Sequence, residues 1–158
     1  MAEPLADRVI EGIDQAAELY HRLVVLVAPA GTGKTATLQD VHERTSAPLV
    51  NVNLELSRRM LDLTERQRAL QLPRLLSEIV GGFSVDVVLL DNVEVLFDVS
   101  LKQDPLRLLQ GLSRNKTVVA AWSGFVDGEN MVYAAPDHPE YRRYPVRDFL
   151  VVHSEAIA

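Results

Sequence analysis

Cysteine is absent from the 158 residues, so neither a disulfide framework nor a thiolate metal site can form. The four histidines do not suggest a metal site either, because they stand far apart along the chain, at positions 21, 42, 138 and 153. Glycine and proline are scarce, with eight of each, while 47% of the residues are hydrophobic and 24% are charged. This composition is typical of a globular domain and not of a disordered chain. We expect one domain over residues 1–158.

Long apolar runs are also missing. No run approaches the roughly 20 residues that a membrane-spanning helix needs, and the N-terminus lacks the basic and apolar segments of a signal peptide. Together with the absence of cysteine, this favours a soluble protein of the reducing cytoplasm, without a membrane partner.

Positive charge is in deficit, since the formal net charge is −6. A protein that coats nucleic acid needs clustered lysine and arginine, so the deficit argues against that function. The densest basic stretch, residues 58–74, is interrupted by Asp62 and Glu65, and we interpret it as a solvated helix face. A local contact with DNA stays open.

Apolar runs alternate with helical periodicity along the chain. This alternation predicts an α/β fold: a three-layer parallel sheet of about five strands with helices on both faces. An irregular surface connection is expected over 134–148, after a small hairpin over 125–133. The expected strands are 23–27, 49–52, 85–90, 117–122 and 149–152; the expected helices are a first one after Pro4 that includes Val9 to Tyr20, then 34–44, 57–80 with a break at Pro73, and 105–112.

A phosphate-binding loop lies between the first expected strand and the following helix. Its glycines let successive N–H groups face inward, Lys34 reaches the terminal phosphates, and the Thr35 hydroxyl binds Mg²⁺. Alanine replaces the usual glycine in the first position. The predicted ATP-binding residues are Ala28, Pro29, Ala30, Gly31, Thr32, Gly33, Lys34, Thr35 and Ala36.

Asp91 follows four apolar residues at the end of the expected strand 85–90. In P-loop enzymes an aspartate in this place holds the magnesium ion, so we predict Asp91 as the second metal residue after Thr35. One of Asn92 and Glu94 should orient the attacking water. A carboxylate accepts a proton and an amide does not, which favours Glu94. The alternative is that Glu94 only caps or decorates a helix.

Further candidates come later in the chain. Ser123 ends the fourth expected strand and is predicted to contact the γ-phosphate; the alternative is a turn residue beside Gly124. We interpret Trp122 as a packing residue and not as a base-stacking one. Arg142 and Arg143 precede the fifth strand and are predicted to reach a γ-phosphate in a neighbouring subunit, against the alternative of two solvated arginines.

GTP is disfavoured as the nucleotide. Residues 115–118 resemble the start of a guanine-reading motif, but Val118 stands where that motif requires aspartate.

These motifs together resemble the core of AAA+ ATPases. The chain departs from that family by ending just after the fifth expected strand, which leaves no room for a helical lid, and by carrying Asp91-Asn92 where an acidic pair is expected. More narrowly, the chain resembles BrxF, a family of small P-loop proteins of type III BREX systems, which exclude bacteriophage. The segments that carry this resemblance are 51–59, 90–97, 103–106 and 141–145.

The resemblance implies phage defence together with other BREX proteins, in a homo-oligomer with ATP at the subunit interfaces. Hydrolysis would then control assembly or docking. Two alternatives remain open from the residues: a nucleotide-gated interaction module with negligible hydrolysis, and a small kinase. Against the kinase, the sequence has no clear arginine-rich segment that could enclose a phosphoryl acceptor.

Overall fold

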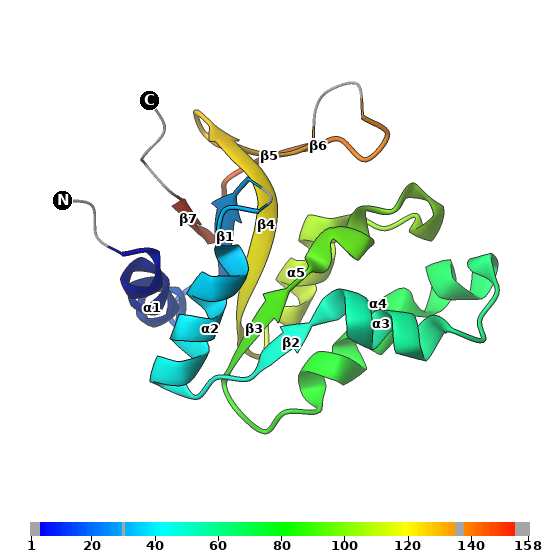
Figure 1. The fold of residues 1–158 in the computed structure, drawn as a ribbon, viewed down its shortest axis with the longest axis horizontal. Helices are drawn as coiled ribbons and strands as arrows, with labels where there is room; N and C mark the ends of the chain where they lie inside the picture. The colour runs from blue at the N-terminus through cyan, green and yellow to red at the C-terminus, as the bar shows by residue number, and fades with distance from the viewer. Residues whose placement is uncertain (1–3, 30, 135–137, 154–158) are drawn as a thin grey trace.

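Five parallel strands form the centre of the molecule in the computed structural model, which describes residues 4–29, 31–134 and 138–153 (Figure 1). Their order in the sheet is β2-β3-β4-β1-β7, so that β4 lies between β1 and β3. The predicted α/β class with a mostly parallel sheet is confirmed. The strands are β1 (Leu23–Ala28), β2 (Leu49–Asn51), β3 (Val87–Asp91), β4 (Thr117–Asp127) and β7 (Leu150–His153).

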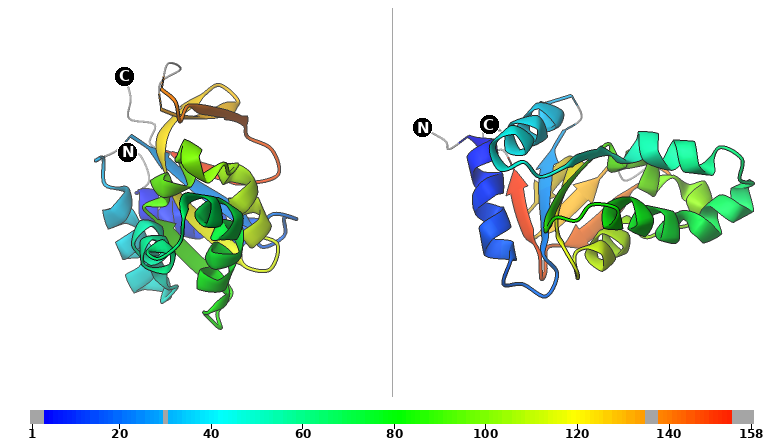
Figure 2. Two further views of the ribbon diagram at one scale, coloured as in Figure 1. Left: turned by 90° about the vertical axis from the view of Figure 1, so that its right-hand side faces the viewer. Right: turned by 90° about the horizontal axis from the view of Figure 1, so that it is seen from below.

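Helices cover both faces of this sheet, which gives the three predicted layers (Figure 2). Val24 and Leu26 of β1 belong to the core beneath α1 (Leu5–Ala16) and α2 (Lys34–Thr45). Leu23 and Val25 belong to the opposite core, beneath α3 (Val52–Met60), α4 (Glu65–Gly81) and α5 (Pro105–Leu112). Successive side chains of one strand thus enter opposite cores, because a strand alternates its side chains between the two faces of the sheet.

Several predicted boundaries shift by a few residues. The first helix ends at Ala16, so Ala17 lies outside it and Tyr20, which is 69% exposed, does not pack as predicted. β3 and β7 each begin later than expected. Within the described part of the chain, no helix combines the length and the apolar character that a bilayer crossing requires.

Asn51 ends β2 one residue earlier than predicted. Its side chain accepts a hydrogen bond from the Leu54 N–H group at 3.0 Å, which caps α3 at its N-terminus. Residue 52, expected in the strand, therefore begins a helix, because a capping asparagine satisfies a first-turn N–H group that has no partner within the helix.

The predicted break at Pro73 is wrong. The break lies at residues 61–64, where Thr64 and Gln67 form a reciprocal capping box that starts α4, and α4 continues through Pro73. Proline has no N–H group to donate to the Ala69 carbonyl. The Gln103 side chain donates to this carbonyl at 2.7 Å and replaces the missing bond.

β4 continues beyond the parallel sheet into an antiparallel extension. It pairs with β5 (Asn130–Tyr133), as the predicted hairpin requires, and β5 pairs with β6 (Arg142–Pro145). The irregular connection predicted over 134–148 is therefore corrected, because it contains a strand. Tyr144 of β6 donates to Asp104 at 2.8 Å, and Asp104 also caps α5, so the extension is tied to the main domain.

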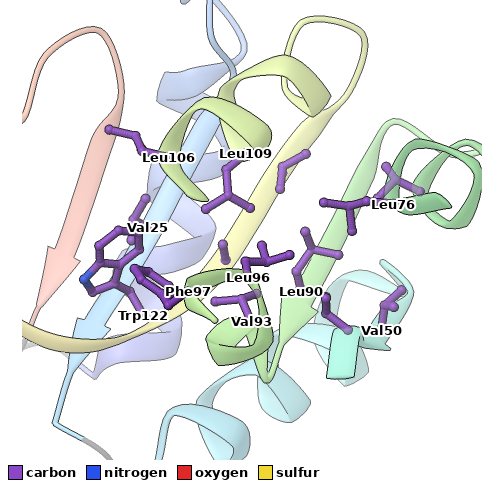
Figure 3. Close-up of a cluster of buried hydrophobic side chains, with 14 of the residues drawn as sticks. Val25, Val50, Leu76, Leu90, Val93, Leu96, Phe97, Leu106, Leu109 and Trp122 are labelled. Atoms are coloured by element: carbon purple, nitrogen blue, oxygen red, sulfur yellow. The ribbon is translucent and has the colours of Figure 1, made fainter. Parts of the chain in front are cut away.

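Aromatic side chains join the extension to the core. Trp122 lies edge-on to Phe97 at 5.0 Å between ring centroids, and Phe97 stacks on Tyr133 at 3.6 Å. Phe97 comes from the 3-10 helix η1 (Val93–Phe97), which is followed by η2 (Val99–Leu101). Figure 3 shows Trp122 and Phe97 beside each other, with Val93 and Leu96 of η1 nearby. Trp122 is fully buried, which agrees with its predicted role in packing.

Candidate functional site

A cleft of about 980 Å³ opens where β1, β3 and β4 reach their carboxyl ends. Ligands of open parallel sheets bind at this edge. We name its two parts for the elements that form them. The loop end consists of Pro29, Gly31, Gly33, Lys34, Thr35, Ala36 and Gln39; the hairpin end consists of Gly124, Phe125, Tyr133, Ala134, His138 and Glu140; Asp91, Asn92, Glu94 and Ser123 lie between them.

Two left-handed glycines shape the loop end. Gly31 has φ 77° and Gly33 has φ 96°, values that side chains rarely adopt, and Gly33 immediately precedes α2. The loop thereby meets the N-terminus of a twelve-residue helix, whose first N–H groups have no partner within the helix and whose dipole favours an anion. Thr32 closes the loop by donating to the Pro29 carbonyl. Ala30, a predicted loop residue, lies outside the described residues.

Lys34 is only 8% exposed although it carries a charge. Its ammonium group donates to the carbonyls of Ala28 at 3.2 Å and Pro29 at 3.0 Å. Burial lowers the pKa of Lys34, and the carboxylates of Glu94 and Asp91 oppose that shift. The lysine is thus a cation enclosed by the loop and faced by two acids.

Thr35 and Asp91 meet in the middle of the cleft. The Thr35 hydroxyl donates to Asp91 Oδ2 at 2.7 Å, and the Asn92 N–H group donates to Asp91 Oδ1 at 2.9 Å. One hydroxyl and one carboxylate are hard oxygen ligands, which suit Mg²⁺ when the substrate and water supply the rest of its shell. In the described ranges, no group of three or more His, Cys, Asp or Glu side chains is arranged to hold a metal ion unaided.

Ser123 and Glu94 form a second hydrogen-bonded pair in the cleft. The Ser123 hydroxyl donates to Glu94 Oε2 at 2.6 Å, across 29 residues of sequence. Asn92 has a left-handed backbone with φ 54°, after which the chain enters η1, where Glu94 lies. The structure therefore brings Asp91, Asn92, Glu94 and Ser123 into one wall of the cleft with Lys34 and Thr35.

The hairpin end contains residues that the sequence analysis did not select. Gly124 is essential to its shape, because a Cβ atom there would lie 1.8 Å from the Val132 carbonyl oxygen. Phe125, Tyr133, His138 and Glu140 are scattered over 16 positions, and no local pattern marks them. The expected hairpin could have indicated them, because it comes directly after the strand that ends in Ser123.

Arg142 and Arg143 do not line this cleft and have partners within their own chain. Arg142 is partly buried and donates to the Gln103 carbonyl at 3.1 Å. Arg143 is more exposed and pairs with Asp127 at 3.0 Å. Both lie on β6 and not in an irregular segment.

The comparisons with known proteins add little. No family model matches the chain, and no curated protein matches it. Among solved structures, one of C. elegans PCH-2 matches with 17% sequence identity and a TM-score of 0.39. That match covers 78% of this chain, which spans only 36% of the PCH-2 chain. The case for a function therefore depends on the cleft itself.

Proposed function

We propose that this protein binds ATP with magnesium in the cleft and hydrolyses it to ADP and phosphate. The observation that supports this most is that one cleft is lined by the glycine loop and Lys34, by the Thr35–Asp91 pair and by the Ser123–Glu94 pair. Hydrolysis of a phosphoanhydride needs an anion cradle, metal ligands and a base for the attacking water, and this cleft contains residues suited to each.

At the loop end, the backbone around Gly31 and Gly33 and the N-terminus of α2 would hold the phosphates. Lys34 would neutralise the charge of the terminal phosphates. Thr35 and Asp91 would hold Mg²⁺, which when bound neutralises charge that develops on the β- and γ-phosphate oxygens. The γ-phosphate would then face Glu94 and Ser123, because Lys34 interacts with the Glu94 carboxylate and Ser123 is bonded to it.

Glu94 would act as the general base. As water attacks the γ-phosphorus, the bond to the bridging oxygen breaks and the water proton passes to the Glu94 carboxylate. Ser123 donates to that carboxylate, which makes the serine a positioning residue for the base. Asn92 lacks a proton-accepting group, so its contribution is the left-handed turn that lets Asp91 and Glu94 share the cleft.

A calorimetric titration of ATP with Mg²⁺ tests the binding step. Lys34→Ala should abolish measurable ATP affinity and phosphate release, because it removes the enclosed cation. Lys102→Asn is the matched control: Lys102 is an exposed lysine outside the cleft with φ 55°, a backbone conformation that asparagine tolerates. Unchanged ATP binding in Lys34→Ala would refute the site. Binding without phosphate release would favour the nucleotide-gated interaction module.

We also propose that one arginine of β6 serves a neighbouring subunit. Arg143 is the better candidate, because its pair with Asp127 is exposed to solvent and is easily exchanged for a phosphate. Arg142, bonded to a backbone carbonyl, has a role within its own chain. Mixing Arg143→Ala with Lys34→Ala protein should restore part of the phosphate release. Full activity of Arg143→Ala alone would contradict a role in trans.

The resemblance to BrxF supports a role in phage exclusion. In a bacterium that carries a BREX operon with this gene, we expect deletion of the gene to raise the efficiency of plaque formation. The unaltered gene should restore exclusion, and the Lys34→Ala gene should not. Exclusion that persists without the gene would refute this role.

A further inference from the structure

The hairpin end of the cleft collects acidic and aromatic groups that the proposed phosphate chemistry leaves unused. Tyr133 is 8% exposed and lines the cleft, yet within the described residues its hydroxyl makes no hydrogen bond. Burial raises the pKa of Tyr133 to about 12, with further contributions from the carboxylates of Glu140 and Glu94. The neutral hydroxyl is therefore within electrostatic reach of two acids.

The Lys34 cation faces Glu94, and no second lysine or arginine among the described lining residues serves Glu140 at the hairpin end. Among the described residues that line the cleft, Lys34 is the only lysine or arginine, and the loop carbonyls hold it at the other end. His138 already accepts the Glu140 N–H group at Nδ1, at 3.0 Å. The Glu140 carboxylate and the Tyr133 hydroxyl, with no lysine or arginine beside them among the described lining residues, attract a positive ligand.

Phe125 narrows the class of that ligand. Phe125 is 49% exposed and lines the hairpin end of the cleft. Aromatic faces attract organic cations, and carboxylates form charge-assisted hydrogen bonds with their N–H groups. A metal ion is less well served, because Glu94 already accepts from Ser123 and an aromatic ring supplies no oxygen ligand.

We propose that the hairpin end is a binding subsite for a guanidinium or ammonium group, held by Glu140, Tyr133 and Phe125. Because Glu94 and Ser123 separate the two ends, a cation bound there would lie beside the position assigned to the γ-phosphate. The group could belong to a free amine or guanidine, or to a basic side chain of a second copy of this chain. The binding itself requires no nucleotide.

Guanidinium and urea provide a matched pair of probes, since they have similar planar shapes and differ in charge. In nucleotide-free protein, guanidinium should give saturable shifts of the Gly124 and Phe125 amide resonances. Its dissociation constant should be on the order of 1 mM, as expected for four heavy atoms. Urea should give no saturable shift. Equal responses to both probes would overturn the proposal.

Single substitutions test whether guanidinium binds at the hairpin end. Glu140→Gln should weaken guanidinium binding at least about tenfold, because a hydrogen bond to a charged group is lost. Tyr133→Phe keeps the ring and its stacking on Phe97, and should weaken binding about threefold, the lower range of one hydrogen bond. The control is Glu129→Gln, an exposed acid of the same hairpin outside the cleft. If Glu140→Gln folds and binds as tightly as this control, the subsite does not exist.

Two further measurements separate the possible outcomes. Lys34→Ala should lose ATP but keep guanidinium binding, so the two proposals fail independently. Light scattering with Mg-ATP identifies the source of the cation. An increase in mass that guanidinium reverses and urea does not would assign the subsite to a side chain of a second copy. An unchanged mass with guanidinium still bound would assign it to a free cation.

Discussion

The two ends of the cleft are built in different ways. At the loop end, one run from Pro29 to Ala36 supplies nearly every group, and its geometry depends on backbone conformation. At the hairpin end, β4, β5 and the segment before β6 bring between one and three side chains each, and the geometry depends on close packing. A local motif is therefore sufficient for the first end, and only the folded chain produces the second.

Glycine illustrates this difference. A Cβ atom on Gly33 would contact nothing within 4 Å, and the obstacle to a side chain there is φ alone. A Cβ atom on Gly124 would collide with a backbone oxygen of β5, although φ is ordinary. The same residue type thus provides torsional freedom at one end and space at the other.

Glu94 belongs to the boundary between the ends, and its removal should have the largest effect. Glu94→Gln should slow phosphate release by about two to four orders of magnitude while ATP affinity persists, because a positioned base is lost. Asn92→Ala should cause a smaller loss. Single-turnover phosphate release and equilibrium ATP binding, measured on both variants, provide the check. If Asn92→Ala abolished phosphate release and Glu94→Gln did not, the assignment of Glu94 as the general base would be wrong.

The second prediction concerns the two glycines, Gly124 and Gly33. Gly124→Ala should reduce the free energy of unfolding by about 3 kcal/mol, the upper range for overpacking, because the β4–β5 backbones must separate. Gly33→Ala should reduce it by about 1 kcal/mol, the lower cost of a left-handed alanine, and should impair ATP binding instead. Urea denaturation measures both values. If Gly33→Ala were the more destabilising, the proposed difference between the ends would be wrong.

Ser123→Ala should have the smallest effect. The variant breaks the bond to Glu94, and a hydrogen bond to a charged group corresponds to roughly tenfold or somewhat more in rate. The decrease should appear in the rate constant of hydrolysis, and ATP affinity should stay the same. Ser113→Ala, a buried serine outside the cleft, controls for packing. Loss of ATP affinity in Ser123→Ala would instead indicate a direct phosphate contact.

The sequence was sufficient to predict the parallel sheet, its layers and the loop residues and Asp91 that line the cleft, although Gln39 at the loop end was not predicted. Each of these depends on a run of apolar residues or on a contiguous motif. The break at Pro73 could not be predicted locally, because Gln103, 34 positions from Ala69, supplies the missing hydrogen bond. The hairpin end was missed for the same reason, since Glu140 and Phe125 become neighbours of one cleft only through the pairing of β4 with β5.

Asn92 limits which sequences this site tolerates. Its left-handed backbone strains most side chains, whereas asparagine and glycine occupy it readily. A glutamate in position 92, where many ATPases carry their base, would cost roughly 1–2 kcal/mol in this conformation. The acid stands two residues further on, in η1, where the backbone imposes no such penalty and Ser123 is within reach. Variants that retain activity should therefore carry glycine, asparagine or aspartate at position 92, and position 94 should keep its carboxylate.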